Sequence, residues 1–237
     1  MIIKAVLFDL YGTLLDIVVD EASEEFWSAL KQKYGFTASP TELRQSYLRR
    51  VDVDPSREGL ILTNVFEDML RNTGLKPSND DVTSLARDFR SLSIISLTVR
   101  PYTRPLLEHL RRSSVRLGLV SNTEAVLTAY DLDQTKIGEF FDVILLSSDL
   151  GIKKPDKRVF DSALRSLNAS KQNTVFIGDN LTDDIEGARR AGLRSIYVMN
   201  QPRSPLTMFG SDKEMVRASQ PTLEGILGAL DSFESVE

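Results

Sequence analysis

The segment from Ile2 to Phe8 is a nearly unbroken run of apolar, mostly branched residues. Such a run is typical of a strand that is buried on both faces, as in the centre of a parallel α/β sheet. Asp9 stands where this strand ends, and Gly12 then permits a sharp turn of the chain. Because ligands of open α/β sheets bind beyond the carboxyl ends of the strands, we expect Asp9 to face a ligand site.

A helical pattern replaces the strand pattern after this turn. Apolar residues recur at helical spacing in four segments, which begin near Glu21, Pro40, Arg57 and Asn79. Pro101 biases its predecessor out of helical geometry and marks the return to the main domain. The pattern predicts a helical insertion over residues 16–98, between the first strand and the rest of the sheet.

Beyond the insertion, strand and helix patterns alternate. The predicted strands are Val115–Val120, Val143–Leu146, Thr174–Ile177 and Ser195–Val198. Alternation of this kind predicts parallel strands with right-handed crossovers, that is, a doubly wound α/β sheet. Residues 1–15 and 99–237 would then form one core. Residues 201–220 are less regular, and we expect a surface loop there.

Composition narrows the classes of function. A net charge of -5 offers no basic face for nucleic acid or an anionic membrane. The chain has no cysteine, which excludes disulfides and thiol nucleophiles, and its single histidine makes a histidine-centred triad improbable. The sequence contains no run of about 18 apolar residues, so we expect no membrane-spanning helix. We expect a cytoplasmic protein that uses carboxylate chemistry.

Polar residues follow successive predicted strands at the point where each strand ends. Asp9 follows the first strand, Ser121 and Asn122 the second, Lys154 the loop after the third, and Asp179 the fourth. Any one of them is explained by ordinary capping at a strand end. Because adjacent parallel strands end at one edge of the sheet, the whole series predicts a site there.

Four segments in this order resemble the motifs of the haloacid dehalogenase-like (HAD) hydrolase superfamily, in the subfamily with a helical cap inserted after the first motif. The four segments are Phe8–Leu14, Val120–Asn122, Gly151–Asp156 and Ile177–Asp184. The resemblance spans residues 2–198. It implies a three-layer α/β sandwich in which the helical insertion, residues 16–98, is a small cap domain.

A carboxylate nucleophile is consistent with these residues. Asp9 could attack a phosphorus or carbon centre and form a covalent intermediate that water then hydrolyses. Ser121 and Asn122 would donate hydrogen bonds to the transferred anionic group, with help from Thr13. Lys154 would supply a fixed positive charge and offset the repulsion between Asp9 and an anionic substrate.

The acids of the fourth motif predict a metal ion. Asp179 and Asp184 add negative charge at the same edge, and several carboxylates that face an anion need a cation with oxygen ligands, such as Mg²⁺. The family resemblance implies that Asp9, the backbone carbonyl of Tyr11 and Asp179 hold this ion. Asp184 matches the second acid of the motif, which supports the metal site or Lys154.

Tyr11 departs from the usual phosphatase pattern. Phosphatases of the family usually have a second aspartate there, which protonates the leaving group and then activates water. Tyrosine, with a pKa of ~10, replaces it poorly near neutral pH. The 2-haloacid dehalogenases of the superfamily characteristically have tyrosine at this position. In those dehalogenases, however, the fourth motif resembles Ser-Ser-Asn and no metal is used. This chain has Gly178-Asp179 there instead.

We favour a Mg²⁺-dependent phosphatase that hydrolyses a small phosphorylated metabolite through an aspartyl-phosphate on Asp9. One alternative is a metal-independent 2-haloacid dehalogenase, whose halide-binding cation would come from Arg44, Arg49 or Arg50. Another is a weakly catalytic binding protein with the HAD fold. The expected partner is a small anionic molecule, with neither nucleic acid nor membrane involved.

Overall fold

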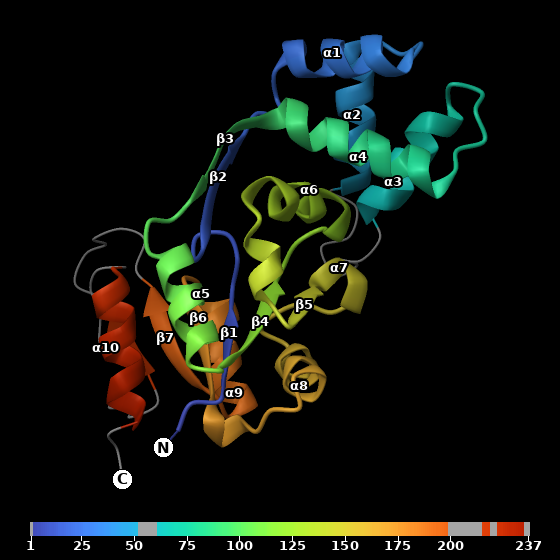
Figure 1. Ribbon diagram of the computed structural model, residues 1–237. Coiled ribbons are helices and arrows are strands. Elements are labelled where there is room, and N and C mark those ends of the chain that lie inside the picture. Colours follow the sequence, from blue (N-terminus) through green and yellow to red (C-terminus); the bar gives the residue numbers. More distant parts are fainter. Residues whose placement is uncertain (1, 52–60, 199–214, 219–221, 235–237) are drawn as a thin grey trace.

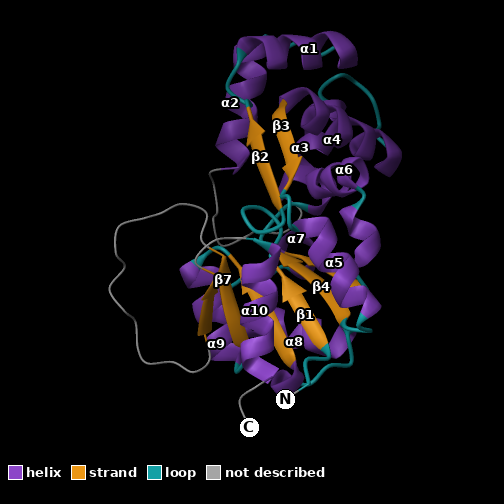
Figure 2. Cartoon of the chain, turned by 60° about the vertical axis from the view of Figure 1, so that its left-hand side comes forward, coloured by secondary structure: helices purple, strands orange, loops and turns teal. Residues whose placement is uncertain are grey.

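The protein is described here by a computed structural model that covers residues 2–51, 61–198, 215–218 and 222–234. Six strands of these residues form a parallel sheet in the order β5-β4-β1-β6-β7-β8. The strands are β1 (Ala5–Phe8), β4 (Arg116–Ser121), β5 (Val143–Leu146), β6 (Thr174–Gly178), β7 (Arg194–Val198) and β8 (Met215–Ala218). The predicted fold class, a doubly wound parallel sheet, is confirmed (Figures 1 and 2).

The first strand is buried on both faces, as its apolar run predicts. Val6 and Phe8 belong to one hydrophobic cluster, whereas Ala5 and Leu7 belong to another, and all four are fully buried. The first cluster includes residues of α5 (Thr103–Arg112) and α10 (Leu223–Glu234), and the second includes residues of α8 (Lys157–Ser166) and α9 (Gly187–Ala191). Helices therefore cover both faces of the sheet and make three layers.

The four predicted helices of the insertion are present. They are α1 (Glu24–Tyr34), α2 (Pro40–Val51), α3 (Ile61–Arg71) and α4 (Asn79–Ser93). Ser23 caps α1 by accepting a hydrogen bond from the N–H of Phe26, and Ser78 forms a capping box with Asp81 at α4. The helix predicted from Arg57 has its first residues outside the described ranges.

The helices of the insertion have a hydrophobic core of their own. Phe26, Trp27, Phe66 and Phe89 are at most 4 % exposed, and the ring centroids of Phe26 and Phe89 lie 4.9 Å apart. Leu127 joins the same cluster, although it belongs to α6 (Ala125–Thr135), the helix that follows β4 of the main sheet. The helical unit therefore packs directly on α6 (Figure 1).

Two strands that the sequence analysis missed connect the helical unit to the core. β2 (Leu15–Val19) and β3 (Ile94–Val99) pair as an antiparallel ribbon (Figure 2). A salt bridge of 2.6 Å between Arg100 Nη2 and Asp16 Oδ1 lies at the core end of the ribbon. The sequence predicts an insertion that is helical throughout, because each of these strands is too short to reveal a partner far away in the sequence.

The loop predicted over residues 201–220 is wrong for residues 215–218. These residues form β8, which pairs in parallel with β7. Residues 199–214 and 219–221 lie outside the described ranges. Among the helices that the structure describes, none is both long enough and apolar enough to cross a membrane.

Gly118 in β4 provides a test of how tightly the sheet is packed. A Cβ atom there would lie 2.6 Å from Leu7 Cδ2 and 3.2 Å from Val143 Cγ1. We expect Gly118→Ala to cost about 1–3 kcal/mol through overpacking. At roughly 2–4 °C per kcal/mol for a chain of this size, calorimetry should show a lower melting temperature. Gly138→Ala is the control, since its added Cβ would meet nothing closer than 3.5 Å; equal melting temperatures would contradict the packing argument.

Candidate active site

The loop after β1 winds tightly and presents Asp9 and Thr13 to the same side. The Asp9 N–H continues the sheet by donating to Ile177 O at 2.9 Å, while Gly12 adopts a φ of +80°. The N–H groups of Leu14 and Leu15 both donate back to the carbonyl of Leu10. This winding brings Thr13 Oγ1 to 3.3 Å from Asp9 Oδ2. Asp9 and Thr13 therefore lie together, as the sequence predicts.

Lys154 lies between two carboxylates. Its Nζ is 2.7 Å from Asp9 Oδ1 and 2.7 Å from Asp184 Oδ1, and its side chain is only 2 % exposed. Burial alone would lower the pKa of Lys154, but the charges of Asp9 and Asp184 raise it above its usual value. The Lys154 amine therefore stays protonated and forms ion pairs with both carboxylates.

Ser121 and Asn122 lie beside this ion pair but make different contacts. Ser121 Oγ is 3.4 Å from Asp9 Oδ1, at the long end of a hydrogen bond. Asn122 bonds to the backbone of Lys154 twice, since its Nδ2 donates to Lys154 O at 2.9 Å and its Oδ1 accepts from Lys154 N at 2.8 Å. Asn122 thus fixes the loop that carries Lys154. Its role as a donor to substrate stays a prediction.

Asp184 owes its position to Gly178, a residue that the sequence analysis gave no role. A Cβ atom on Gly178 would lie 2.4 Å from Asp184 Oδ2, so only glycine leaves room for this carboxylate. The N–H of Asn180 donates to the same oxygen at 3.0 Å. Burial raises the pKa of Asp184, while the charge of Lys154 opposes this and that of Asp9 adds to it.

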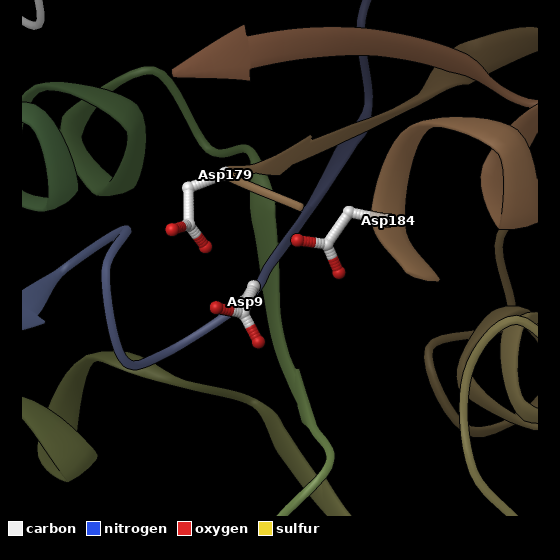
Figure 3. A group of neighbouring side chains, drawn as sticks. All are labelled: Asp9, Asp179 and Asp184. Atoms are coloured by element: carbon white, nitrogen blue, oxygen red, sulfur yellow. The ribbon is translucent and has the colours of Figure 1, made fainter. Parts of the chain in front are cut away.

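Three carboxylates meet at the edge of the sheet. Oxygen atoms of Asp9, Asp179 and Asp184 lie within 4.8 Å of one another (Figure 3). Burial, followed by repulsion from Asp9, raises the pKa of Asp179 to about 6. The three acids outnumber the single ammonium of Lys154, and their hard oxygen donors suit a divalent cation such as Mg²⁺. The cluster could therefore hold a metal ion.

The cluster opens into a small polar cavity of about 220 Å³. Its lining residues are Asp9, Tyr11, Ser121, Asn122, Thr123, Lys154, Asp179, Asn180, Asp183 and Asp184. They come from the carboxyl ends of strands and from the segments that follow those strands at one edge of the main sheet. The volume lies below the ~300–1,000 Å³ typical of pockets for drug-sized ligands, so it suits a small anionic group.

The phenol of Tyr11 is held in a buried network. Its hydroxyl donates to Asp131 Oδ2 on α6, and Arg90 Nη2 on α4 lies 3.2 Å from the hydroxyl oxygen. Burial, followed by the charge of Asp131, raises the pKa of Tyr11 well above its usual value. The phenol is therefore a poor source of a proton for a leaving group near neutral pH.

Among the arginines proposed for halide binding, the two with described side chains do not line the cavity. Arg44 and Arg49 are exposed on α2. The side chain of Arg50 lies outside the described part of the chain. The functional contact between Arg90 and Asp131 could not be predicted from the sequence, because helical periodicity places both among buried residues without revealing that they face each other.

A model of the haloacid dehalogenase-like hydrolase family matches residues 3–192. The chain therefore belongs to this family of hydrolases, which confirms the resemblance drawn from the four motifs.

Relatives within the family have different activities. The chain is 29 % identical over 199 residues to the glyceraldehyde 3-phosphate phosphatase of Methanopyrus kandleri, with 83 % of this chain and 84 % of the relative aligned. A phosphoserine phosphatase of Thermus thermophilus is 33 % identical over 41 % of this chain and 39 % of the relative. A 2-haloacid dehalogenase structure from Pseudomonas syringae superposes with a TM-score of 0.69 at 26 % identity, over 97 % of this chain and 99 % of the other.

The raised pKa of Asp179 predicts a pH-dependent penalty in metal-free protein. Well below the unfolded pKa of about 4, the group is protonated in both states and costs nothing. The penalty grows as pH rises and is complete above the folded pKa of about 6. Asp179→Asn removes the charge, so in EDTA it should raise the melting temperature more at pH 7.5 than at pH 4.5. Exposed Glu139→Gln is the control, and a pH-independent gain for Asp179→Asn would contradict this account.

Proposed function

We propose that this protein is a Mg²⁺-dependent phosphatase that hydrolyses a small phosphorylated metabolite through an aspartyl-phosphate on Asp9. The observation that carries the proposal is the pairing of Asp9 with Lys154 beside a cluster of three carboxylates. Without a metal ion, the three carboxylates would repel an anionic substrate. The phosphatase names of the relatives from Methanopyrus and Thermus agree with it.

In this mechanism Asp9 attacks the phosphorus atom and forms an acyl phosphate, while the P–O bond breaks and the leaving group departs as an alkoxide or phenoxide that takes its proton from water. Lys154 and Thr13 orient the attacking carboxylate through its two oxygens. Ser121 donates a hydrogen bond to the transferred anionic group, and Lys154 offsets its negative charge. Water then hydrolyses the acyl phosphate and regenerates Asp9.

We assign the metal site to Asp9, Asp179 and the backbone carbonyl of Tyr11. Asp184 supports the site from its bond to Lys154. When bound there, Mg²⁺ supplies positive charge that reduces the repulsion between Asp9 and the phosphate.

The helical unit, over residues 16–98, would act as a cap on the core formed by residues 1–15 and 99–237. Its own hydrophobic cluster and its attachment through the β2–β3 ribbon support this division. A cap seated over the cavity would exclude water during phosphoryl transfer. In a cytoplasmic setting, its surface would select among small phosphate esters.

Metal dependence and the nucleophile are tested together with p-nitrophenyl phosphate. We expect hydrolysis with Mg²⁺, loss of activity in EDTA and recovery when Mg²⁺ is restored. Asp9→Asn should lower kcat by at least about 10³-fold, because the nucleophile is lost. Asp183→Asn is the matched control from the same cavity and should retain most activity. Substantial turnover by Asp9→Asn would refute the covalent mechanism.

The leaving group tests the role of Tyr11. Since the phenol supplies no proton, kcat/KM should fall by about 10²-fold or more from p-nitrophenyl phosphate to an alkyl phosphate of similar size. Aryl and acyl phosphates should be the better substrates. Comparable values for both esters would mean that another group acts as the acid.

The second candidate is a metal-independent 2-haloacid dehalogenase, which Tyr11 and the likeness to the Pseudomonas structure favour. Chloride release from L-2-chloropropionate that EDTA leaves unchanged would establish it in place of the phosphatase. If neither substrate reacts and beryllium fluoride does not occupy Asp9, a binding protein with the HAD fold becomes the better description.

A further inference from the structure

A buried network joins three separate parts of the molecule. Arg90 Nε lies 3.1 Å from Asp131 Oδ1 and 3.0 Å from Oδ2, and Arg90 Nη2 lies 2.6 Å from Oδ2. The Tyr11 hydroxyl donates to the same Asp131 oxygen. Asp131 is fully buried and Arg90 is 8 % exposed. We call these three residues the clamp.

Each member of the clamp belongs to a different functional part. Arg90 lies on α4 of the helical unit, Asp131 on α6 of the core, and Tyr11 in the loop two residues after Asp9. The guanidinium carbon of Arg90 also lies 5.9 Å from the centre of the Tyr11 ring. The clamp therefore links the helical unit, the core and the loop that carries the nucleophile.

Burial of these charges favours the paired arrangement of the clamp. Two charges removed from water are tolerated only while they remain paired with good geometry. If α4 moved away from α6, Arg90 would leave a buried carboxylate without its cation. Seating of the helical unit and pairing of Arg90 with Asp131 are therefore one event.

The same two helices carry a second pair that differs in burial. Arg87 Nη2 lies 3.1 Å from Asp133 Oδ2, but the two side chains are 57 % and 40 % exposed. Such exposed pairs contribute little, because water and salt screen them. This pair shares the chemistry and the helices of the clamp and lacks its contact with Tyr11. It provides a matched control.

We propose that Arg90 and Asp131 are positioning residues that hold Tyr11, so that seating of the cap and the geometry of the Asp9 loop are set together. Tyr11 then acts as an anchor for the loop at the position where related phosphatases carry an acid. The kinetic part of the test below rests on the phosphatase function proposed above. The distance measurement between cap and core does not depend on that function.

The experiment combines a distance with kinetics. The chain has no cysteine, so Ser84→Cys on α4 and Ser166→Cys on α8, both exposed, can carry a pair of spin labels. Pulsed electron resonance then measures the separation between cap and core. Hydrolysis of p-nitrophenyl phosphate gives kcat and KM for the same variants without labels.

Asp131→Asn should broaden the distance distribution and lower kcat at least tenfold, with a smaller change in KM. Asp133→Asn should alter neither readout. Arg90→Lys, which keeps the charge, should retain more activity than Arg90→Met. An unchanged distance and kcat for Asp131→Asn, or equal effects of Asp131→Asn and Asp133→Asn, would overturn the proposal.

Tyr11→Phe keeps the test decisive if Asp131→Asn does not fold. It removes one hydroxyl and leaves the pair of Arg90 and Asp131 intact. The distance should stay as in the parent protein while kcat falls, because only the loop is released. Unchanged kcat would refute the coupling to the loop. If the parent protein lacks phosphatase activity, the proposed function fails, and the distances for Asp131→Asn and Asp133→Asn still decide whether the clamp seats the cap.

Discussion

The buried ammonium of Lys154 between Asp9 and Asp184 is the interaction on which the site depends. A carboxylate buried as deeply as Asp184 is costly without a positive partner, and a buried ammonium is equally costly without an acid. Lys154 meets both needs because Asn122 holds its backbone in place. Gly178 leaves the space that Asp184 occupies. The nucleophile is thus oriented by residues from separate segments of the chain, namely the residue after β4, the loop that carries Lys154 and the end of β6.

Tyr11 acquires its meaning from its surroundings. Considered with the first motif alone, it favours a dehalogenase, since no proton is needed when a halide departs. In the fold its hydroxyl is committed to Asp131 and Arg90, while the neighbouring carboxylates form a cluster suited to a cation. Tyr11, which bears on the choice between the two reactions, thus also contacts the helical unit through Arg90.

Much of the fold could be predicted because its signals are local. The apolar run of β1, the alternation that follows and the helical spacing of apolar residues in the insertion each reside in a few neighbouring residues. The β2–β3 ribbon and β8 were missed because their hydrogen bonds connect segments far apart in the sequence. Arg90 and Asp131 escaped notice for the same reason, since neither helix alone indicates what it faces.

The order of the four motifs and the hydrophobic periodicity can be followed along the chain, so they are sufficient to assign the family, the doubly wound sheet and the set of polar residues at the strand ends. The contacts that those residues make follow only from the folded chain. Asp9 shares Lys154 with Asp184, and Asn122 serves the backbone of Lys154. Tyr11 is bound into the contact between α4 and α6. These pairings join residues that are far apart in the sequence. The loop after β1 therefore forms a site only where the fold brings Lys154 to Asp9 and Arg90 to Tyr11.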